Sequence, residues 1–287
     1  MSLPLPTSLT PSKVSSFKDC ALAFRFSAID RLPEPASPAA YKGTLVHRAL
    51  QLLFWDEPAG SRSMAAAMAK LEQAWAEAQD DPEFVELSLT EADVTDFRAD
   101  AELLVRRYFE LEDPDQVQVI GTELRLEVEI GSLKLRGIID RLELDSNGDL
   151  VVTDYKTGRS PGASFEQSRM GGVHFYAFLC EQVLGVRPVR IQLLHLREPV
   201  AISMVPSDQS IRGLQQRTQA IWSAVERACE TDSFKPKPGR LCDWCSFKAY
   251  CPAFGGDPQG ALDVVAARST AGSTTSTAVA PHLSVAV

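Results

Sequence analysis

Two short segments of the chain carry the residue types that can hydrolyse a phosphodiester bond. The segment "GIIDR" at residues 137–141 contains Asp140, and "DYKTG" at residues 154–158 contains Asp154 and Lys156. Side chains two positions apart on a strand project to the same face, so Asp154 and Lys156 are predicted to lie side by side. If the two segments are neighbours, two carboxylates and an ammonium group meet at one point.

This group of side chains suits a hydrated divalent cation that binds a phosphate. Carboxylate oxygens are ligands for Mg2+ or Mn2+, which keep several waters when bound. Such an ion makes a bound water more acidic, while the ion and a lysine stabilise the charge that builds on the phosphorus oxygens. The predicted reaction is phosphodiester hydrolysis. Either segment alone also fits exposed charges with a weak ion pair, but their order and spacing together favour a site.

Cysteines form a second group with metal-binding potential. Of the six in the chain, Cys242, Cys245 and Cys251 lie in "CDWCSFKAYC" at spacings typical of metal ligands, which leaves the fourth ligand of a tetrahedral site to be found. Cys180 and Cys229 fall in helical patterns and are expected to be buried as small apolar residues. In a reducing cytoplasm, thiols and metal ligands are more common than disulfides.

The elements that position these residues are predicted from the apolar pattern. Helical periodicity covers residues 11–26, 41–54, 64–79, 91–110, 165–184 and 207–230. Period-two alternation predicts strands at residues 117–130, 133–144, 150–155, 189–196 and 200–204. Gly131 and Ser132 join the first two strands as a hairpin, and a turn at residues 146–148 folds the strand with Asp140 back onto the next one. The fold class is therefore α/β (α+β), a sheet flanked by helices.

Composition places the chain among ordinary globular proteins. Its 287 residues are 45% hydrophobic and 23% charged, enough to bury a large core. The sequence lacks an apolar run of about 18 residues and a signal peptide pattern, which predicts a cytoplasmic protein with no membrane segment. The formal charge of −9 argues against a general nucleic-acid coat, so any DNA contact must use a local basic patch.

The C-terminal end of the predicted domain follows from composition. Residues 266–287 have almost no charge and much Ser, Thr and Ala, which predicts a disordered tail after a domain at residues 9–265. The phosphate loop pattern "GxxxxGK[ST]" is not found in the sequence, so no ATP site is visible. If the protein works beside a helicase, that motor is expected to be a separate protein.

The two acidic segments resemble the second and third motifs of the PD-(D/E)XK nucleases, in particular the RecB-like exonuclease group. The resemblance implies a restriction-endonuclease-like core with a central mixed sheet flanked by helices. That group also has a helix with a Gly and a metal-binding His, which "GTLVHRAL" matches at Gly43 and His47. The resemblance thus implies His47, Asp140 and Asp154 as ligands of Mg2+ or Mn2+, with Lys156 assisting the water or the phosphate.

Two further positions follow from the same resemblance. Glutamates on the strand before the hairpin approach the metal in the family, which makes Glu123 a weaker candidate. Family members carry a Gln four residues before a Tyr on the helix after the lysine strand, where both help position the lysine, the water or the DNA. Here Tyr176 is present as a supporting catalytic residue, and Gly172 stands at the Gln position.

Some members of the group hold an iron-sulfur cluster by one cysteine ahead of the nuclease core and three after it. The segment "LTPSKVSSFKDCALAFRF" resembles the upstream half, which implies Cys20 as the fourth ligand of a 4Fe-4S cluster with Cys242, Cys245 and Cys251. Such a cluster would tie residues 222 positions apart (242 minus 20) and so act as a staple closing the core. Zinc at the same cysteines is the alternative. Three nearby aromatic residues are expected to shield the site from water: Trp244, Phe247 and Tyr250.

The sequence therefore predicts a metal-dependent DNA nuclease, an exonuclease acting in DNA repair or recombination. A second hypothesis, favoured by Gly172, is a catalytically weakened iron-sulfur module that binds DNA or a partner. A third is a structural zinc protein whose carboxylates form only ion pairs. The candidates for a basic path that contacts DNA are Arg25, Arg136, Arg141, Arg159, Arg169, Lys235 and Lys237.

Overall fold

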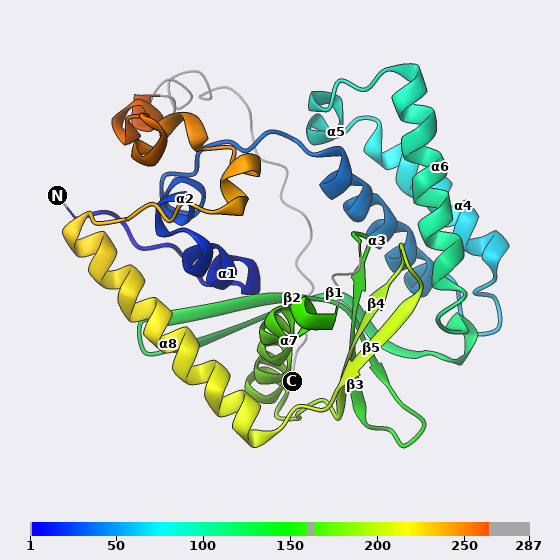
Figure 1. Ribbon diagram of the computed structural model, residues 1–287. Coiled ribbons are helices and arrows are strands. Elements are labelled where there is room, and N and C mark those ends of the chain that lie inside the picture. Colours follow the sequence, from blue (N-terminus) through cyan, green and yellow to red (C-terminus); the bar gives the residue numbers. More distant parts are fainter. Residues whose placement is uncertain (1, 160–162, 264–287) are drawn as a thin grey trace. The chain divides into compact units, whose positions relative to one another are not determined.

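The computed structural model describes residues 2–159 and 163–263, without the side chains of residues 163–173 (Figure 1). The chain divides into two compact units. We call residues 6–15 and 35–227 the sheet unit, and residues 1–5, 16–34 and 228–287 the cysteine unit. The predicted tail at residues 266–287 lies outside the described residues, and the domain predicted at residues 9–265 stays a prediction.

The sheet unit contains a mixed sheet of five strands in the order β1-β2-β3-β4-β5. The strands are β1 Gln118–Ile130, β2 Leu133–Leu144, β3 Leu150–Lys156, β4 Arg190–His195 and β5 Val200–Met204. Only β3 and β4 pair in parallel, and the connection between them contains helix α7 (Ala163–Leu184), because parallel neighbours need a long crossover. The predicted mixed sheet flanked by helices is confirmed.

Glycines in left-handed conformations close the turns on both sides of β2. Gly131 has φ 61° in the β1–β2 turn, and Gly148 has φ 82° in the β2–β3 turn, a region that glycine enters without a Cβ clash. Asp145 also holds the second turn, because its Oδ1 accepts from the backbone N–H groups of Asn147 and Asp149. These turns set the register in which Leu144 pairs with Leu150 and Arg141 with Thr153.

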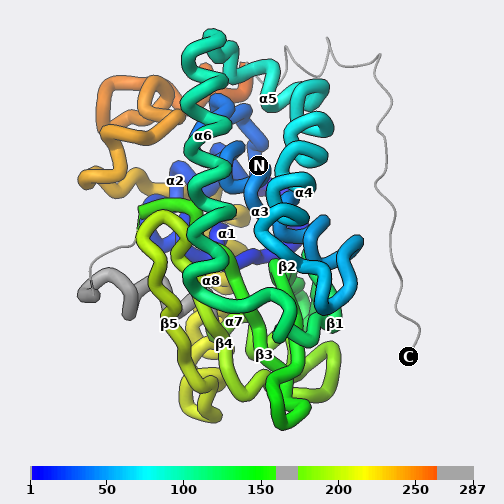
Figure 2. Tube along the Cα trace, turned by 90° about the vertical axis from the view of Figure 1, so that its right-hand side faces the viewer, coloured from blue at the N-terminus to red at the C-terminus, as the bar shows by residue number. Residues whose placement is uncertain are grey.

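Helices α3 (Pro38–Asp56), α4 (Met64–Ala78) and α6 (Glu91–Tyr108) run alongside one another and cover part of the sheet (Figures 1 and 2). Their N-termini are capped by Ser37, Ser63 and Thr90, each accepting from a backbone N–H of the first turn. The apolar face of α3 is buried, and the core that it forms with α4 and α6 includes Tyr155 of the sheet. This packing fixes α3 against β3.

The remaining elements of the structure are mostly short. They are α1 (Pro11–Asp19), α2 (Ala21–Phe24), α5 (Pro82–Glu86), α8 (Asp208–Thr231), the π-helix η1 (Arg25–Ile29) and the 3-10 helices η2 (Pro114–Gln116), η3 (Arg240–Trp244), η4 (Lys248–Tyr250) and η5 (Pro252–Phe254). None of the helices among the described residues is both long and apolar enough to cross a membrane.

The predicted elements match the observed ones closely, with one correction. The continuous helix predicted at residues 11–26 is wrong, because Cys20 has extended backbone angles, φ −158° and ψ 111°, which separate α1 from α2. Apolar periodicity continues through that position and hides the break. The short helix α5 and the 3-10 helices were not predicted, since single turns carry little periodic signal.

Candidate active site

Asp140 lies near the middle of β2, where two other strands present groups to it. Across the β2–β3 pair, the backbone N–H of Tyr155 donates to Asp140 Oδ2 at 2.7 Å. Across the β1–β2 pair, Thr122 pairs with Arg141 and Leu124 with Ile139, so Glu123 stands opposite Asp140. The hairpin and the following turn therefore bring groups from three strands to one carboxylate.

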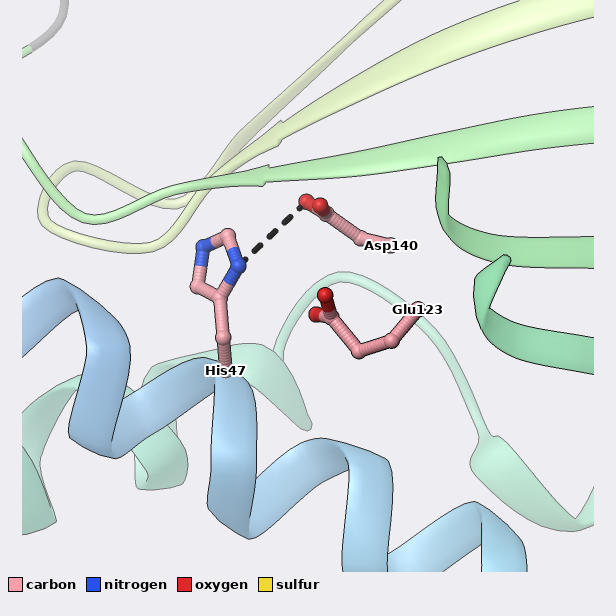
Figure 3. A group of neighbouring side chains, drawn as sticks. All are labelled: His47, Glu123 and Asp140. Atoms are coloured by element: carbon pink, nitrogen blue, oxygen red, sulfur yellow. Dashed lines mark ion pairs between the residues drawn. The ribbon is translucent and has the colours of Figure 1, made fainter. Parts of the chain in front are cut away.

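His47 approaches the same carboxylate from α3. Its Nδ1 lies 3.5 Å from Asp140 Oδ2 (Figure 3). Its Nε2 lies 3.1 Å from the carbonyl oxygen of Tyr155. Burial lowers the pKa of His47, which favours the neutral ring. A neutral imidazole that contacts a carbonyl donates from that nitrogen, so Nε2–H donates to Tyr155 and Nδ1 keeps its lone pair. This is how a metal-ligating histidine is commonly oriented.

Glu123, the weaker candidate from the sequence, completes a group of three potential ligands. One ligand atom each of His47, Glu123 and Asp140 lies within 4.8 Å of the others, and the three side chains converge in Figure 3. Glu123 has φ 50°, a left-handed conformation that costs a non-glycine residue about 1 kcal/mol. Strain of this kind persists where the surrounding structure requires it. The position opposite Asp140 in the hairpin register was the signal that could have identified Glu123.

Asp154 and Lys156 share one face of β3 as predicted, and Lys156 Nζ forms an ion pair with Asp154 Oδ2. Asp154 is buried, whereas the Lys156 side chain is 41% exposed. Among the described residues, Asp154 lies outside the group of three whose ligand atoms approach within 4.8 Å. The structure thus brings two of the three predicted metal ligands together with Glu123. Asp154 lies beside them, close enough to affect the pKa of Asp140.

The carboxylates raise one another's proton affinity. Burial raises the pKa of Asp140 well above its ordinary value, and the charges of Asp154 and Glu123 raise it further. Burial also raises the pKa of Glu123, with a contribution from Asp154. Three buried or partly buried carboxylates with one nearby ammonium leave excess negative charge, which a divalent cation would neutralise. The oxygen and imidazole donors present therefore fit Mg2+ or Mn2+.

Tyr176 of α7 lies near enough to this group for its carboxylates to affect the pKa of the phenol. Burial raises its pKa, and the charges of Asp154, Asp140 and Glu123 raise it further, so the phenol stays protonated and can donate. Gly137 of β2 lets α7 come close, because a Cβ there would lie 2.7 Å from Leu179 Cδ1 and 3.2 Å from the Tyr176 ring. Gly172 lies in the same helix, four residues before Tyr176.

Gly43, the glycine of the segment "GTLVHRAL", has a packing role on α3 similar to that of Gly137 on β2. A Cβ at this position would lie 3.0 Å from Thr157 Oγ1, in the segment that follows Lys156. Close approach of α3 to the end of β3 places His47, one helical turn further along, beside the carbonyl of Tyr155. The sequence pattern of a Gly four residues before the His therefore has a geometric cause.

Arg141 is buried, which corrects its prediction as a DNA-contacting residue. Its side chain is fully inaccessible and forms ion pairs with Glu112 and Glu143. It also donates to the hydroxyls of Tyr155 at 2.9 Å and Tyr108 at 3.2 Å. Because strand side chains alternate, Arg141 projects away from the face that carries Asp140. The face that carries Arg141 is the one covered by helices α3, α4 and α6.

The other basic residues predicted to contact DNA differ in the exposure of their side chains. Arg25 is largely buried in ion pairs with Asp30 and Asp232, so its predicted DNA contact is also wrong. Arg136 is exposed and paired with Glu127. The side chain of Arg169 lies outside the described residues. Exposed candidates that keep their predicted role are Arg159, Lys235 and Lys237.

Comparison with known proteins identifies the family. Residues 8–252 match the sequence profile of the PD-(D/E)XK nuclease superfamily. The chain belongs to the PD-(D/E)XK nuclease superfamily. The match spans the whole of the site described above, and it agrees with the mixed sheet that carries Asp140 and Asp154. A PD-(D/E)XK nuclease acts on nucleic acid and typically uses a divalent metal.

Two relatives of this PD-(D/E)XK protein add detail. The Gene 69 protein of Mycobacterium phage L5 is 27% identical over 135 residues, which are 46% of this chain and 44% of that protein. The chain thus matches less than half the length of this curated relative. A crystal structure described as a candidate exonuclease from Eubacterium rectale superposes with a TM-score of 0.53 at 12% identity, covering 83% of this chain and 86% of that one. At this identity the likeness shows the fold alone.

The four cysteines predicted as ligands all lie in the cysteine unit. Burial raises the pKa of the Cys245 thiol, and Cys20, Cys242 and Cys251 each raise it further. No three of these described cysteines have sulfurs within 4.8 Å of one another. A single zinc ion with bonds of 2.3 Å would hold them about 3.8 Å apart. A cluster spaces them further, because each thiolate binds a different iron.

Local contacts shape the segment that carries three of these thiols. The backbone N–H of Gly239 donates to Cys242 Sγ at 3.3 Å. Gly256 packs on the Cys251 loop so closely that a Cβ would lie 2.7 Å from the Cys251 nitrogen. The other two cysteines, Cys180 and Cys229, are buried as predicted.

The aromatic residues around these cysteines differ in their exposure to solvent. Phe247 is buried with its ring 5.5 Å from that of Phe26, and Tyr250 packs on the same ring at 6.3 Å. Trp244 is 87% exposed, so the prediction that it shields the cysteines from water is wrong. It lies in the short η3 helix, which is too short to bury both of its sides.

Proposed function

We propose that the protein is a divalent-metal-dependent deoxyribonuclease of the RecB-like group, an exonuclease acting in DNA repair or recombination. The observation that carries this proposal is the convergence of His47, Glu123 and Asp140 within 4.8 Å, beside the Asp154–Lys156 pair. Carboxylates with raised pKa values and a neutral imidazole form a set that binds a divalent cation. Membership of the superfamily supports a nucleic-acid substrate.

In this proposal each side chain has a distinct task. His47, Asp140, Asp154 and Glu123 would hold the ion, which would supply polarisation of a phosphoryl oxygen and a more acidic water. The backbone N–H of Tyr155 orients Asp140, and its carbonyl orients His47. Both contacts come from the main chain, so they hold the ligands in place before substrate arrives.

Lys156 and Tyr176 act on the substrate side. Lys156 is partly exposed, so its ammonium group can contact a phosphate oxygen as well as Asp154. Tyr176 stays protonated, so its hydroxyl can donate to a water or a phosphate oxygen. We propose DNA as the substrate, with any helicase supplied by a separate protein, and a cytoplasmic location.

A nuclease assay tests the assignment directly. Purified protein with Mn2+ is given labelled single-stranded and duplex DNA, and the rates of Asp140→Asn, Asp154→Ala and Lys156→Ala are compared with the parent. We expect each variant to lose at least about 100-fold in rate, the range for losing a transition-state contact. The matched control is Asp100→Asn, whose carboxylate pairs with Lys42 away from the site. Unchanged degradation by the Asp154 or Lys156 variant would refute the assignment.

A second candidate function is a DNA-binding or partner-binding module with weak turnover. The observation that favours it is Gly172, which stands on α7 four residues before Tyr176, where the family carries a glutamine. Retained DNA binding without cleavage under any divalent metal would support this alternative. If Gly172 alone limits the rate, Gly172→Gln raises cleavage.

We further propose that Cys20, Cys242, Cys245 and Cys251 hold a 4Fe-4S cluster, with zinc as the alternative. The support for this proposal is that all four cysteines belong to the cysteine unit, with the spacing of one upstream and three downstream thiols that the family uses for a cluster. Iron, acid-labile sulfide and zinc are measured on protein purified without oxygen. Cys245→Ala should lose the metal, while Cys180→Ala, a buried thiol of the sheet unit, should keep it. Zinc without sulfide would decide for the alternative.

A further inference from the structure

Trp244 exposes an aromatic surface on the cysteine unit that the catalytic site does not use. Its side chain is 87% exposed, and two neighbours in the segment are also exposed, Leu241 at 62% and Phe254 at 47%. A large apolar ring gains free energy when it is buried, and grouped exposed apolar side chains mark interaction sites. The ring is rigid, flat and accessible on most of its area.

The charge around Trp244 is opposite in sign to that of the whole chain. Residues 233–256, which are flanked by Asp232 and Asp257, contain four cationic side chains and one carboxylate, a net +3 (4 minus 1), whereas the chain carries −9. The cations are Lys235, Lys237, Arg240 and Lys248, all exposed. The carboxylate is Asp243, whose nearest approach to Lys248 is 3.9 Å. Phosphates in solution would be drawn to this segment in preference to the acidic remainder.

We propose that Trp244 and these four cations form a binding surface for single-stranded nucleic acid, with a base stacked on the indole and phosphates on the cations. Aromatic rings interleaved with Lys and Arg are the pattern by which single strands are held, because every base offers a π-face. A duplex keeps its bases stacked on each other and would leave the indole without a partner. The inference rests on the proposed nucleic-acid substrate and specifies its single-stranded form and where it docks.

The chain supplies a matched control for Trp244. Trp55 of α3 is 61% exposed, so it is also an accessible indole. It is followed by Asp56 and Glu57, whose carboxylates both contact Lys70. Trp55 therefore has the ring without the excess of cations, and the proposal assigns it no role in binding.

Binding is measured on the full-length chain carrying Asp140→Asn, so that cleavage does not interfere. A labelled oligothymidylate is titrated and followed by anisotropy. Trp244→Ala should weaken binding about tenfold, the effect of losing one stacked base. Trp55→Ala should leave the affinity unchanged. Trp244→Phe should keep most of the affinity but abolish the quenching of tryptophan emission that the oligonucleotide causes.

The cations are tested by salt dependence. Lys235→Gln combined with Arg240→Gln removes two phosphate contacts, so the slope of log affinity against log salt should fall by about 1.4. Circular dichroism and metal content of each variant establish that the cysteine unit is still folded. An unchanged slope together with unchanged affinity of Trp244→Ala would overturn the proposal.

The outcomes separate this inference from the proposed catalysis. If the parent protein cleaves DNA and Trp244→Ala binds the oligonucleotide normally, the surface is refuted while the nuclease stands. If the parent does not cleave but Trp244→Ala loses affinity, the nuclease fails while the surface stands. If Trp244→Ala changes only sedimentation and not DNA affinity, the surface contacts protein, which also overturns the proposal.

Discussion

Tyr155 donates its backbone N–H to Asp140 Oδ2 at 2.7 Å, so a main-chain group of β3 orients the carboxylate of β2. The side chain of the same tyrosine extends to the opposite face, where its hydroxyl accepts from Arg141 at 2.9 Å. Arg141 is the residue next to Asp140. A buried polar network on one face of the sheet and the candidate metal site on the other thus share two adjacent positions.

The first prediction concerns this network. Arg141→Met should lower the free energy of unfolding by about 3–5 kcal/mol, because Glu112 and Glu143 would lose the partner of their partly or fully buried carboxylates. The control is Arg136→Met on the same strand, which removes an exposed ion pair with Glu127 and should change stability by about 1 kcal/mol or less. Urea unfolding of both variants at one pH measures the difference. Equal losses of stability in the two variants would show that burial does not increase the contribution of Arg141.

The second prediction separates strain from charge at Glu123. Glu123→Gly should raise the stability of the metal-free protein by about 1 kcal/mol, since glycine adopts φ 50° without a clash. Glu123→Gln keeps the strain and removes only the charge, so it is the matched comparison. Both should weaken Mn2+ binding about tenfold or more, which isothermal titration measures. Undiminished Mn2+ affinity in both would remove Glu123 from the site.

The third prediction is the pH dependence of stability. The folded pKa of Asp140 lies well above its unfolded value. Its contribution to stability is therefore fully present below the unfolded pKa and is lost as pH rises through the folded pKa. Metal-free protein should lose stability across that window, and Asp140→Asn should lose less of it.

Mn2+ should reverse this trend, because the ion binds only the deprotonated carboxylate. The rise in melting temperature on adding Mn2+ should be small at about pH 5 and grow towards pH 8. Melting curves with EDTA and with Mn2+ over this range measure the effect. A shift that is independent of pH would mean that the ion binds elsewhere.

The fourth prediction tests the close approach of α7 to β2. Gly137→Ala places a Cβ 2.7 Å from Leu179 Cδ1 and 3.2 Å from the Tyr176 ring, so it should cost about 1–3 kcal/mol of stability and slow the proposed cleavage. Gly121→Ala in the neighbouring strand meets no atom within 4 Å and is the control. Adding Leu179→Ala to Gly137→Ala should recover part of the rate. If it does not, displacement of Tyr176 by the helix is not the cause.

Much of the sheet unit could be predicted because its signals are local. Alternation of apolar residues along β1 and β2 and the glycines at their turns specify the hairpin, and a spacing of two places Asp154 beside Lys156. His47 could be predicted only through the resemblance to a family, since a lone histidine on a helix carries no such signal. The match over residues 8–252 supports that use of it.

The features that the sequence left uncertain or placed wrongly depend on tertiary contacts. A left-handed Glu123 leaves the strand pattern intact, so only its partner across the hairpin reveals it. Arg141 is charged, and single-residue preference places it at the surface, but five side chains converge to satisfy it. Trp244 is apolar, and the same preference places it inside, yet its segment has too little structure to cover it.

The central place of β3 in the order β1-β2-β3-β4-β5 has a consequence for how the protein can be controlled. Residues 150–153 of β3 pair with β2 and residues 151–156 pair with β4, so the strand that carries Asp154 and Lys156 lies inside the sheet and is expected to separate only when part of the sheet opens. Hydrogen exchange of its amides should be among the slowest in the sheet unit. We therefore expect any regulation of the site to move the helices that carry His47 and Tyr176, while the strand with Asp154 and Lys156 stays in place.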